Sequence, residues 1–107
     1  MTWMLLCLSL ILQPQAVKRT IDGDTFVLYS VGLTDEERVR LLGVDAVELR
    51  DSLGPEAKAF TEQWLARGPF KIDGCKRDSF GRILAVVTRG TDTLATALIK
   101  AELGAPR

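Results

Sequence analysis

The chain has 107 residues, 47% of them hydrophobic and 26% charged, a composition typical of one globular domain and not of a disordered or fibrous chain. Lys plus Arg and Asp plus Glu are equal at 14 each, so no net positive charge is present to hold DNA or RNA tightly. The chain contains no histidine, which excludes the usual zinc sites, Ser-His-Asp triads and histidine general bases. Any chemistry must therefore use carboxylates, arginines or a bound metal ion.

The segment from Met1 to Ala16 differs from the rest because it contains no charged side chain, and Leu5 to Leu12 is nearly all apolar. A short apolar core followed by a small residue predicts a secretory signal, and hence an exported (periplasmic or secreted) protein; without such a signal the protein would be cytoplasmic. The run is shorter than the roughly 20 apolar residues of a membrane span, so no stable membrane partner is expected. The alternatives are a mis-assigned start or a first strand that packs on the domain.

The two cysteines lie on opposite sides of this boundary. Cys7 belongs to the predicted leader and Cys75 to the predicted domain at residues 17–107. Removal of the leader would leave Cys75 alone, and no internal disulfide could then form.

Within residues 17–107, the β-branched and aromatic residues predict strands separated by turn-forming residues. Two strands flank the Asp22-Gly23-Asp24 turn, and a third follows a polar connection. The predicted ranges in this half are strands at 17–21, 26–30 and 38–44, the connection at 32–37, and an irregular acidic stretch at 45–54.

In the second half, Pro55 predicts the start of a helix that Gly68-Pro69 ends. Asp92 or Thr93 can cap a last helix. Two strands are predicted between the helices, at 70–76 and 82–88, and Gly104 and Pro106 are expected to end the last helix.

The predicted order is strand-strand-strand-helix-strand-strand-helix. Five strands with a helix between the third and the fourth fit the OB-fold, a partly open barrel often used to bind oligonucleotides. The expected fold class is therefore α+β and mainly β, a five-stranded OB-fold barrel with two to three helices.

Acidic side chains lie in two of the turns. Asp22 and Asp24 flank Gly23, while Asp45 and Glu48 follow the third strand. Such hard oxygen ligands suit Ca²⁺ or Mg²⁺. Acidic residues are also common in turns for local reasons, because Asp satisfies nearby backbone groups.

Two arginines stand out by their positions. Arg40 lies inside an apolar strand, on the same face as Leu42 and Val44 by the period of two. Arg82 directly follows a glycine at the predicted start of the fifth strand. Each could instead be an ordinary rim or surface charge.

Taken together, these residues match the needs of phosphodiester cleavage. Two guanidiniums can bind phosphate oxygens bidentately, and a divalent ion can polarise the phosphate and orient a water. In a chain without histidine, a carboxylate such as Glu48 is the natural proton acceptor.

Four ordered motifs then resemble the staphylococcal nuclease (thermonuclease) family, over roughly residues 17–105. They carry the sequences IDGDT, VRLLGVDAVE, GPEA and DSFGR, at residues 21–25, 39–48, 54–57 and 78–82.

The resemblance implies Ca²⁺-dependent endonucleolytic cleavage of DNA and RNA, with little base specificity and with single strands favoured. It also implies a role for each matching residue. By this resemblance, Asp24, Asp45 and the backbone carbonyl of Ala46 would hold one Ca²⁺ ion, and Asp22 and Thr25 would lie around these ligands. Glu48 would act as general base or would position the water. Arg40 and Arg82 would bind the scissile phosphate, and Phe80 would be a substrate-binding ring.

The chain departs from the family pattern at several positions. Val47 replaces the usual proline before Glu48, and Phe80 replaces a common tyrosine. Ser79 lacks a lysine seen in some members, Glu102 takes a usual glycine position, and the chain stops at Arg107 while longer members continue. Weaker substrate binding and lower stability are the expected consequences.

Two alternatives to an active enzyme remain. One is a catalytically silent nuclease-like OB module that binds nucleic acid or protein, and the other is a truncated, poorly folded remnant. Loss of activity with a chelator, and in Glu48→Gln or Arg82→Ala, would distinguish the enzyme from the binding module.

Overall fold

The computed structural model describes residues 7–29, 36–48 and 51–107. The predicted connection at 32–37 therefore lies mostly outside the described residues, as does the part of the predicted leader before Cys7. Within the described ranges, no helix is long and apolar enough to cross a membrane. The elements are β1 (Leu8–Leu12), the short 3-10 helix η1 (Pro14–Ala16), β2 (Val17–Asp22), β3 (Thr25–Tyr29), β4 (Glu36–Leu41), β5 (Val44–Ala46), α1 (Gly54–Ala66), β6 (Phe70–Arg77), β7 (Ile83–Arg89), β8 (Asp92–Thr93), α2 (Leu94–Lys100) and β9 (Gly104–Pro106).

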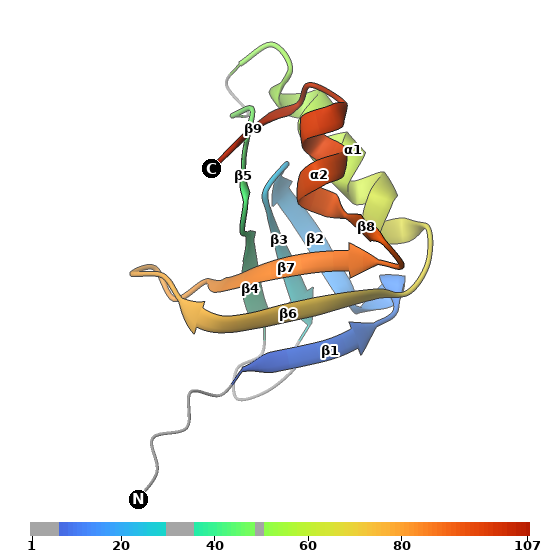
Figure 1. Cartoon of the computed structure of the whole chain (residues 1–107), viewed down its shortest axis with the longest axis vertical. Helices are drawn as coiled ribbons and strands as arrows, with labels where there is room; N and C mark the ends of the chain where they lie inside the picture. Colours follow the sequence, from blue (N-terminus) through green and yellow to red (C-terminus); the bar gives the residue numbers. More distant parts are fainter. Residues whose placement is uncertain (1–6, 30–35, 49–50) are drawn as a thin grey trace, which may run out of the picture.

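One main sheet runs in the order β1-β6-β7-β4-β3-β2, with β8 paired to the last residues of β7, and β5 pairs separately with β9. All these pairings are antiparallel except that of β4 with β7, which is parallel. The five predicted strands are β2, β3, β4, β6 and β7, joined as expected around the helix α1. The sheet is not closed, and an OB-like α+β fold is confirmed. Both helices lie over one end of the sheet, with β5 and β9 beside them (Figure 1).

The third predicted strand differs from the observed one. It was expected to run through to Val44, but β4 ends at Leu41 and the chain bends at Gly43, whose φ is +89°. Leu42 is consequently exposed, while Arg40 and Val44 are buried, so the three do not share one continuous strand face. This bend redirects the chain into β5, which carries Asp45.

The segment after α2 was expected only to end that helix, and this prediction was incomplete. Residues Gly104–Pro106 form β9, which pairs with β5 in the register Val44↔Pro106 and Ala46↔Gly104. A Cβ on Gly104 would lie 2.7 Å from a methyl carbon of Val44, so this close approach requires glycine. The chain end is thereby brought back to the acidic segment.

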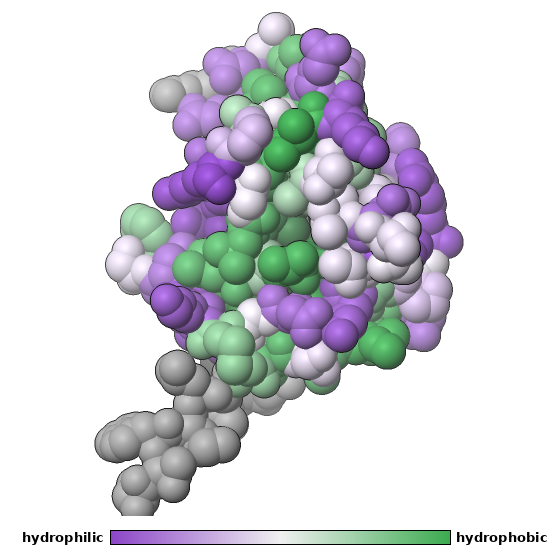
Figure 2. Space-filling view, in the orientation of Figure 1, coloured by the Kyte–Doolittle hydropathy of each residue, from purple (hydrophilic) through white to green (hydrophobic). Residues whose placement is uncertain are grey.

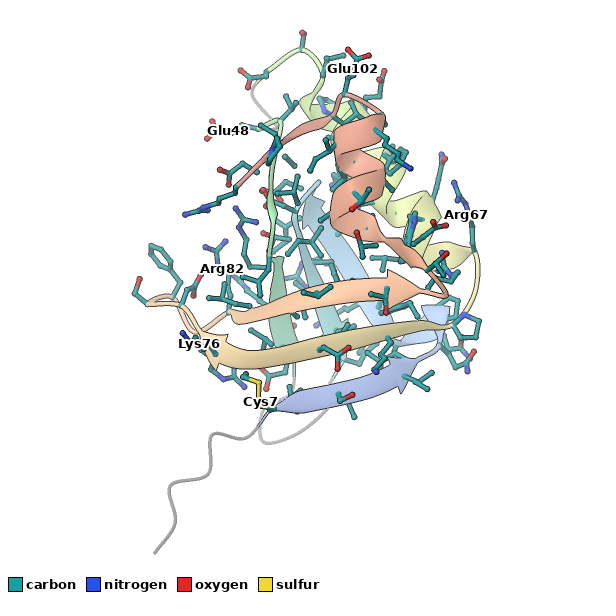
Figure 3. The ribbon with its side chains drawn as sticks, viewed as in Figure 1. Cys7, Glu48, Arg67, Lys76, Arg82 and Glu102 are labelled. Carbon is teal, nitrogen blue, oxygen red and sulfur yellow. A yellow bond between two sulfur atoms is a disulfide. The ribbon has the colours of Figure 1, made fainter. Side chains whose placement is uncertain are left out.

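The apolar residues 8–12 form β1, the outermost strand of the main sheet beside β6. Exposure alternates along it: Leu8, Leu10 and Leu12 pack against the core, while Ile11 is exposed. Cys7 and Cys75 form a disulfide that joins the start of this strand to β6 (Figure 3). A first strand packed on the domain, one of the alternatives for this segment, is what the structure contains. Cleavage of a leader stays a prediction.

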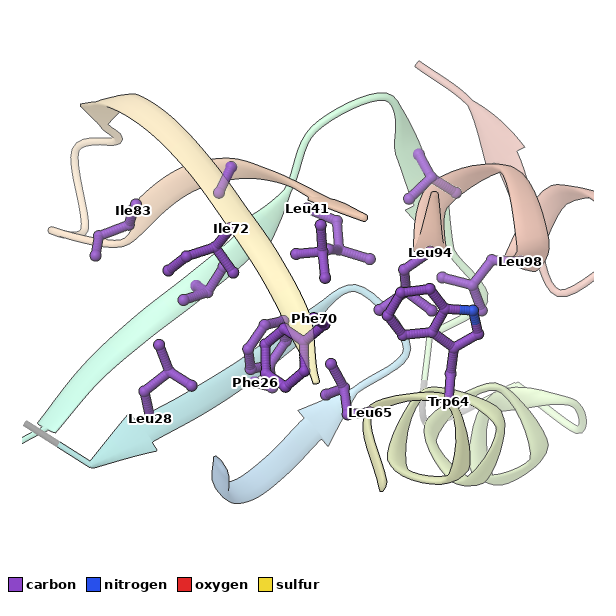
Figure 4. Packing of buried hydrophobic residues seen from close by; sticks show 14 of the residues in the cluster. Phe26, Leu28, Leu41, Trp64, Leu65, Phe70, Ile72, Ile83, Leu94 and Leu98 are labelled. Carbon is purple, nitrogen blue, oxygen red and sulfur yellow. The ribbon is translucent and has the colours of Figure 1, made fainter. Parts of the chain in front are cut away.

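The core lies between facing strands of the curved sheet and continues to the two helices (Figure 4). Phe26 and Phe70 meet edge to face with ring centroids 6.3 Å apart. Trp64 of α1 packs near Leu94 and Leu98 of α2 (Figure 4). The hydroxyl oxygen of Thr93 accepts a hydrogen bond from the Thr96 amide at 3.0 Å, so Thr93 is the observed cap of α2. On the outside, hydrophilic side chains surround an apolar middle of the face seen in Figure 2.

Candidate active site

The turn between β2 and β3 holds two aspartates in different environments. Asp24 is 9% exposed; its Oδ1 accepts a hydrogen bond from the Thr25 hydroxyl at 3.0 Å and its Oδ2 from the Ala46 amide at 2.9 Å. Asp22 accepts from the Asp24 amide at 3.1 Å. Burial, reinforced by the neighbouring Asp24 carboxyl, raises the pKa of Asp22 to about 6. The Ala46 contact fixes this turn directly against β5.

The glycine of that turn is required by packing. A Cβ on Gly23 would lie 2.7 Å from the Cβ of Ala46 and 3.0 Å from the Cβ of Ala57. The buried hydroxyl of Thr61 donates a hydrogen bond of 2.6 Å to the Gly23 carbonyl. The turn is thus held between β5 and α1, and this places the Asp24 carboxylate with little freedom.

Arg40 is a buried cation on the central strand β4, with a side chain that is 8% exposed. Its Nη1 donates to the carbonyls of Leu41 at 2.6 Å and Val44 at 2.8 Å. Its Nη2 lies 2.5 Å from Asp45 Oδ1 and 3.6 Å from Asp24 Oδ2. Two carboxylates, one from the turn after β2 and one from β5, therefore converge on one guanidinium, as a buried charge requires. Asp24 and Asp45, two of the acidic residues singled out in the sequence, thus lie beside the same cation.

Arg82 lies just before β7, in the loop that follows β6, and Asp78 organises that loop. Asp78 Oδ1 accepts from the amides of Phe80 and Arg82, each at 2.9 Å, and Oδ2 accepts from Arg82 Nε at 2.6 Å. The Arg82 amide and side chain are thus fixed by one carboxylate. These hydrogen bonds hold the pKa of Asp78 below its usual value, although desolvation opposes the shift.

Arg40 and Arg82 line the same hollow, which has a volume of about 410 Å³. Leu42 and Leu84 contribute apolar walls, and Arg107 lines it as well. Phe80 also borders the hollow; the residue is 82% exposed, and its ring centroid lies 5.5 Å from the Arg82 guanidinium carbon. An open, cationic hollow with an exposed aromatic ring can accept a phosphate with its attached base.

Glu48 lies beyond β5 and is exposed. It is on the same side of the molecule as Arg82, nearer the end of β5 (Figure 3). It is not one of the residues that line the hollow. The two residues that follow it in the chain lie outside the described ranges. The structure therefore brings Arg40, Arg82, Asp24 and Asp45 into one region and leaves Glu48 at its border.

The oxygen-rich part of this region is suited to a hard divalent cation. Within the described residues, no three His, Cys, Asp or Glu side chains form a metal-binding group. Asp24 and Asp45 supply two carboxylates, and the Ala46 amide holds Asp24 against the backbone of β5. Ca²⁺ takes 6–8 oxygen ligands, so carbonyl oxygens, waters and phosphate can complete a set of this kind. The donor chemistry thus fits calcium, with only part of the ligand set from side chains.

Sequence reasoning missed two functional candidates, Asp78 and Arg107. Asp78 was present in the DSFGR motif, and its position four residues before Arg82 was the available signal. Arg107 Nη1 lies 3.0 Å from Asp45 Oδ1, and its amide donates to the Gly43 carbonyl at 3.2 Å. This contact depends on the pairing of β9 with β5, so no local pattern could reveal it.

The fold and the site together define an OB-like protein with a cationic hollow beside two carboxylates. Residues 38–105 match the family described as "Staphylococcal nuclease homologue". The chain is also 37% identical over 92 residues to the thermonuclease of Staphylococcus intermedius, an alignment that covers 78% of this chain and 54% of that relative. This chain belongs to the staphylococcal nuclease homologue family. It spans about half the length of the curated relative it matches.

Proposed function

We propose that this protein is a Ca²⁺-dependent endonuclease that hydrolyses phosphodiester bonds of DNA and RNA with low base specificity. The observation that carries the proposal is the pairing of Arg40 and Arg82 in one hollow, with Asp24 and Asp45 directly behind Arg40. Family membership supports a nuclease, and the curated relative is named a thermonuclease.

In this proposal the two arginines bind the phosphate at which the chain is cut. Arg40 is anchored by two backbone carbonyls and Arg82 by Asp78, so both guanidiniums are held before substrate arrives. Preorganised donors stabilise the charge that develops on the pentacovalent phosphate without reorganisation during the reaction. A guanidinium can donate two parallel hydrogen bonds to the oxygens of one phosphate, whereas a lysine ammonium acts as a single point charge.

A calcium ion held by Asp24, Asp45 and the Ala46 carbonyl would polarise the phosphate and orient the attacking water. Asp22 accepts a hydrogen bond from the Asp24 amide, and the Thr25 hydroxyl donates one to the Asp24 carboxylate. Both residues would thereby orient Asp24 as a ligand of the ion. Glu48 would accept the proton of the attacking water as a new P–O bond forms. The opposite P–O bond breaks, its electron pair stays on the departing sugar oxygen, and that oxygen takes a proton from solvent water.

The substrate is a nucleic acid strand whose bases can leave the helical stack. The exposed Phe80 ring offers a face on which one base can stack, and such stacking tolerates every base. Single strands are therefore favoured, and base specificity is low. The equal numbers of acidic and basic residues give the chain no general attraction for phosphate, so binding depends on this hollow.

Export is the second part of the proposal. A disulfide such as Cys7–Cys75 persists in oxidising compartments and is rare in the cytosol. A signal cut after Ala16 would remove both Cys7 and β1 from the mature protein. The intact mass of protein recovered from outside the cytoplasm distinguishes export with β1 retained from export with the leader removed. Recovery only from the cytoplasm would contradict export.

The test uses the full chain and single-stranded DNA, with Ca²⁺ or with EDTA, beside Arg82→Ala and Glu48→Gln. We expect cleavage that requires Ca²⁺ and is lost in both variants, each checked for folding by circular dichroism. Lys100→Gln, an exposed charge change on α2, serves as the control that should cut normally. A folded protein that binds DNA and never cuts it would favour the alternative, a catalytically silent binding module.

A further inference from the structure

The strand β9 places one more cation beside the arginines of the hollow. Arg107 follows β9, and its amide is tied to Gly43 at the bend between β4 and β5. Its side chain is 66% exposed, and the residue lines the same hollow as Arg40 and Arg82. Among the described residues, three arginines and one acidic residue, Asp78, line this hollow, although the whole chain has no net charge.

Arg107 and Arg40 differ in what holds them. Both guanidiniums reach Asp45 Oδ1, but Arg40 is buried and also bonded to two carbonyls. In the described part of the chain, the ion pair of Arg107 is made with Asp45, a carboxylate that is itself 53% exposed. Exposed ion pairs of this kind contribute little stability, so the guanidinium can exchange one anion for another at small cost.

We infer that Arg107 binds a second phosphate of the substrate strand, adjacent to the phosphate held by Arg40 and Arg82. A cation bound at Asp45 would compete with Arg107 for that carboxylate, while a phosphate entering the hollow supplies the guanidinium with a new partner. The inference rests on the proposed function, in that it takes this hollow as the nucleic acid site. It adds a residue that neither the motifs nor the family match includes, since that match ends at residue 105.

The test measures binding without cleavage. A fluorescein-labelled oligo(dT) of about 10 nucleotides is titrated with the full chain in EDTA, and binding is followed by anisotropy at several salt concentrations. We expect Arg107→Gln to weaken binding about 5-fold at ~0.1 M salt and to reduce the slope of log K against log salt by about 0.7, the value for one phosphate contact on a single strand. Arg107→Lys should recover the slope and only part of the affinity.

Lys100→Gln is the matched control, because it removes one exposed positive charge on α2 near a different hollow. It should leave the salt slope unchanged. A role for Arg107 only in anchoring β9 would lower the melting temperature of Arg107→Gln and leave the slope intact, which would overturn the inference. Equal behaviour of the two Gln variants, or no binding by the wild-type chain, would overturn it as well.

The outcomes separate this inference from the proposed function. A wild-type chain that cuts DNA with Ca²⁺ while Arg107→Gln binds and cuts normally refutes the role of Arg107 alone. A wild-type chain that binds oligo(dT) through Arg107 and never cuts refutes the nuclease and supports the phosphate contact.

Discussion

Asp78 holds Arg82 at two points, since its carboxylate accepts one hydrogen bond from the Arg82 amide and another from Arg82 Nε, at 2.9 and 2.6 Å. The same carboxylate accepts from the Phe80 amide. One acidic side chain therefore sets the direction of a proposed phosphate-binding arginine and of the neighbouring aromatic ring.

Replacing Asp78 by Asn should lower kcat about 10–100-fold, by analogy with the loss of hydrogen-bond partners of metal ligands. The neutral amide oxygen of Asn accepts a weaker hydrogen bond from the Arg82 guanidinium than a carboxylate does, so Arg82 loses its fixed orientation. Steady-state kinetics on single-stranded DNA would measure the effect, with Asp92→Asn on β8 as the control. Wild-type kcat in Asp78→Asn would show that Arg82 does not need this partner.

Removal of the Cys7–Cys75 disulfide should lower the free energy of unfolding by about 2–4 kcal/mol, because the bridge closes a loop with a sequence separation of 68. Urea unfolding of Cys7→Ser would measure this loss. Dithiothreitol should bring the wild-type chain to the stability of the variant and leave the variant unaffected. If dithiothreitol changed both proteins equally, the disulfide would not be the cause.

Glu102→Gly should raise the free energy of unfolding by about 1 kcal/mol. Glu102 has a φ of +61°, a conformation that suits glycine, and it follows the end of α2. The Glu102 amide donates to the Ile99 carbonyl and the Leu103 amide to the Leu98 carbonyl, the pattern in which helices usually place glycine. Thermal unfolding would measure the gain. Glu102→Ala keeps the Cβ and should give no comparable gain; an equal gain in both would implicate the charge instead.

In the metal-free protein, the stability that Asp22 contributes should be lost as the pH rises from about 4 to about 6. Burial raises the pKa of Asp22 from 3.8 to about 6, so the folded chain holds a proton that the unfolded chain has already lost. The contribution of Asp22 to the free energy of unfolding therefore falls through this range and levels off above it. Urea unfolding in EDTA at several pH values would show the slope, and Asp22→Asn should reduce it. An unchanged slope in Asp22→Asn would assign the effect to other groups.

Local patterns in the sequence predicted much of this fold. Strands β2, β3, β6 and β7 and the helix α1 lie within a residue or two of their predicted ranges. Alternating apolar residues, Pro55 and Gly68-Pro69 favour a strand, a helix start and a helix end through interactions between neighbouring residues. Such local preferences can be recognised without knowledge of the tertiary structure. The motifs also indicated Asp24, Arg40, Asp45 and Arg82, because each matches a site residue of the family that the motifs resemble.

Other features depend on segments that are distant in the sequence. The pairing of β9 with β5 brings Arg107 to Asp45, 62 residues away. The pairing of β1 with β6 brings Cys7 to Cys75. The same pairing makes the apolar segment, which resembles a leader in sequence, a strand of the sheet. A short run of apolar residues is typical of both a signal peptide and an edge strand, so the hydropathy of this segment could not distinguish the two.

The sequence by itself determined the local elements, the OB-like order and the residue types available for chemistry, since these follow from side-chain pattern and composition. The tertiary structure alone decided that Asp24 and Asp45 share the Arg40 guanidinium and that three arginines line one hollow. Those relationships require chain closure over tens of residues, and only the packing of the whole domain specifies which distant groups meet.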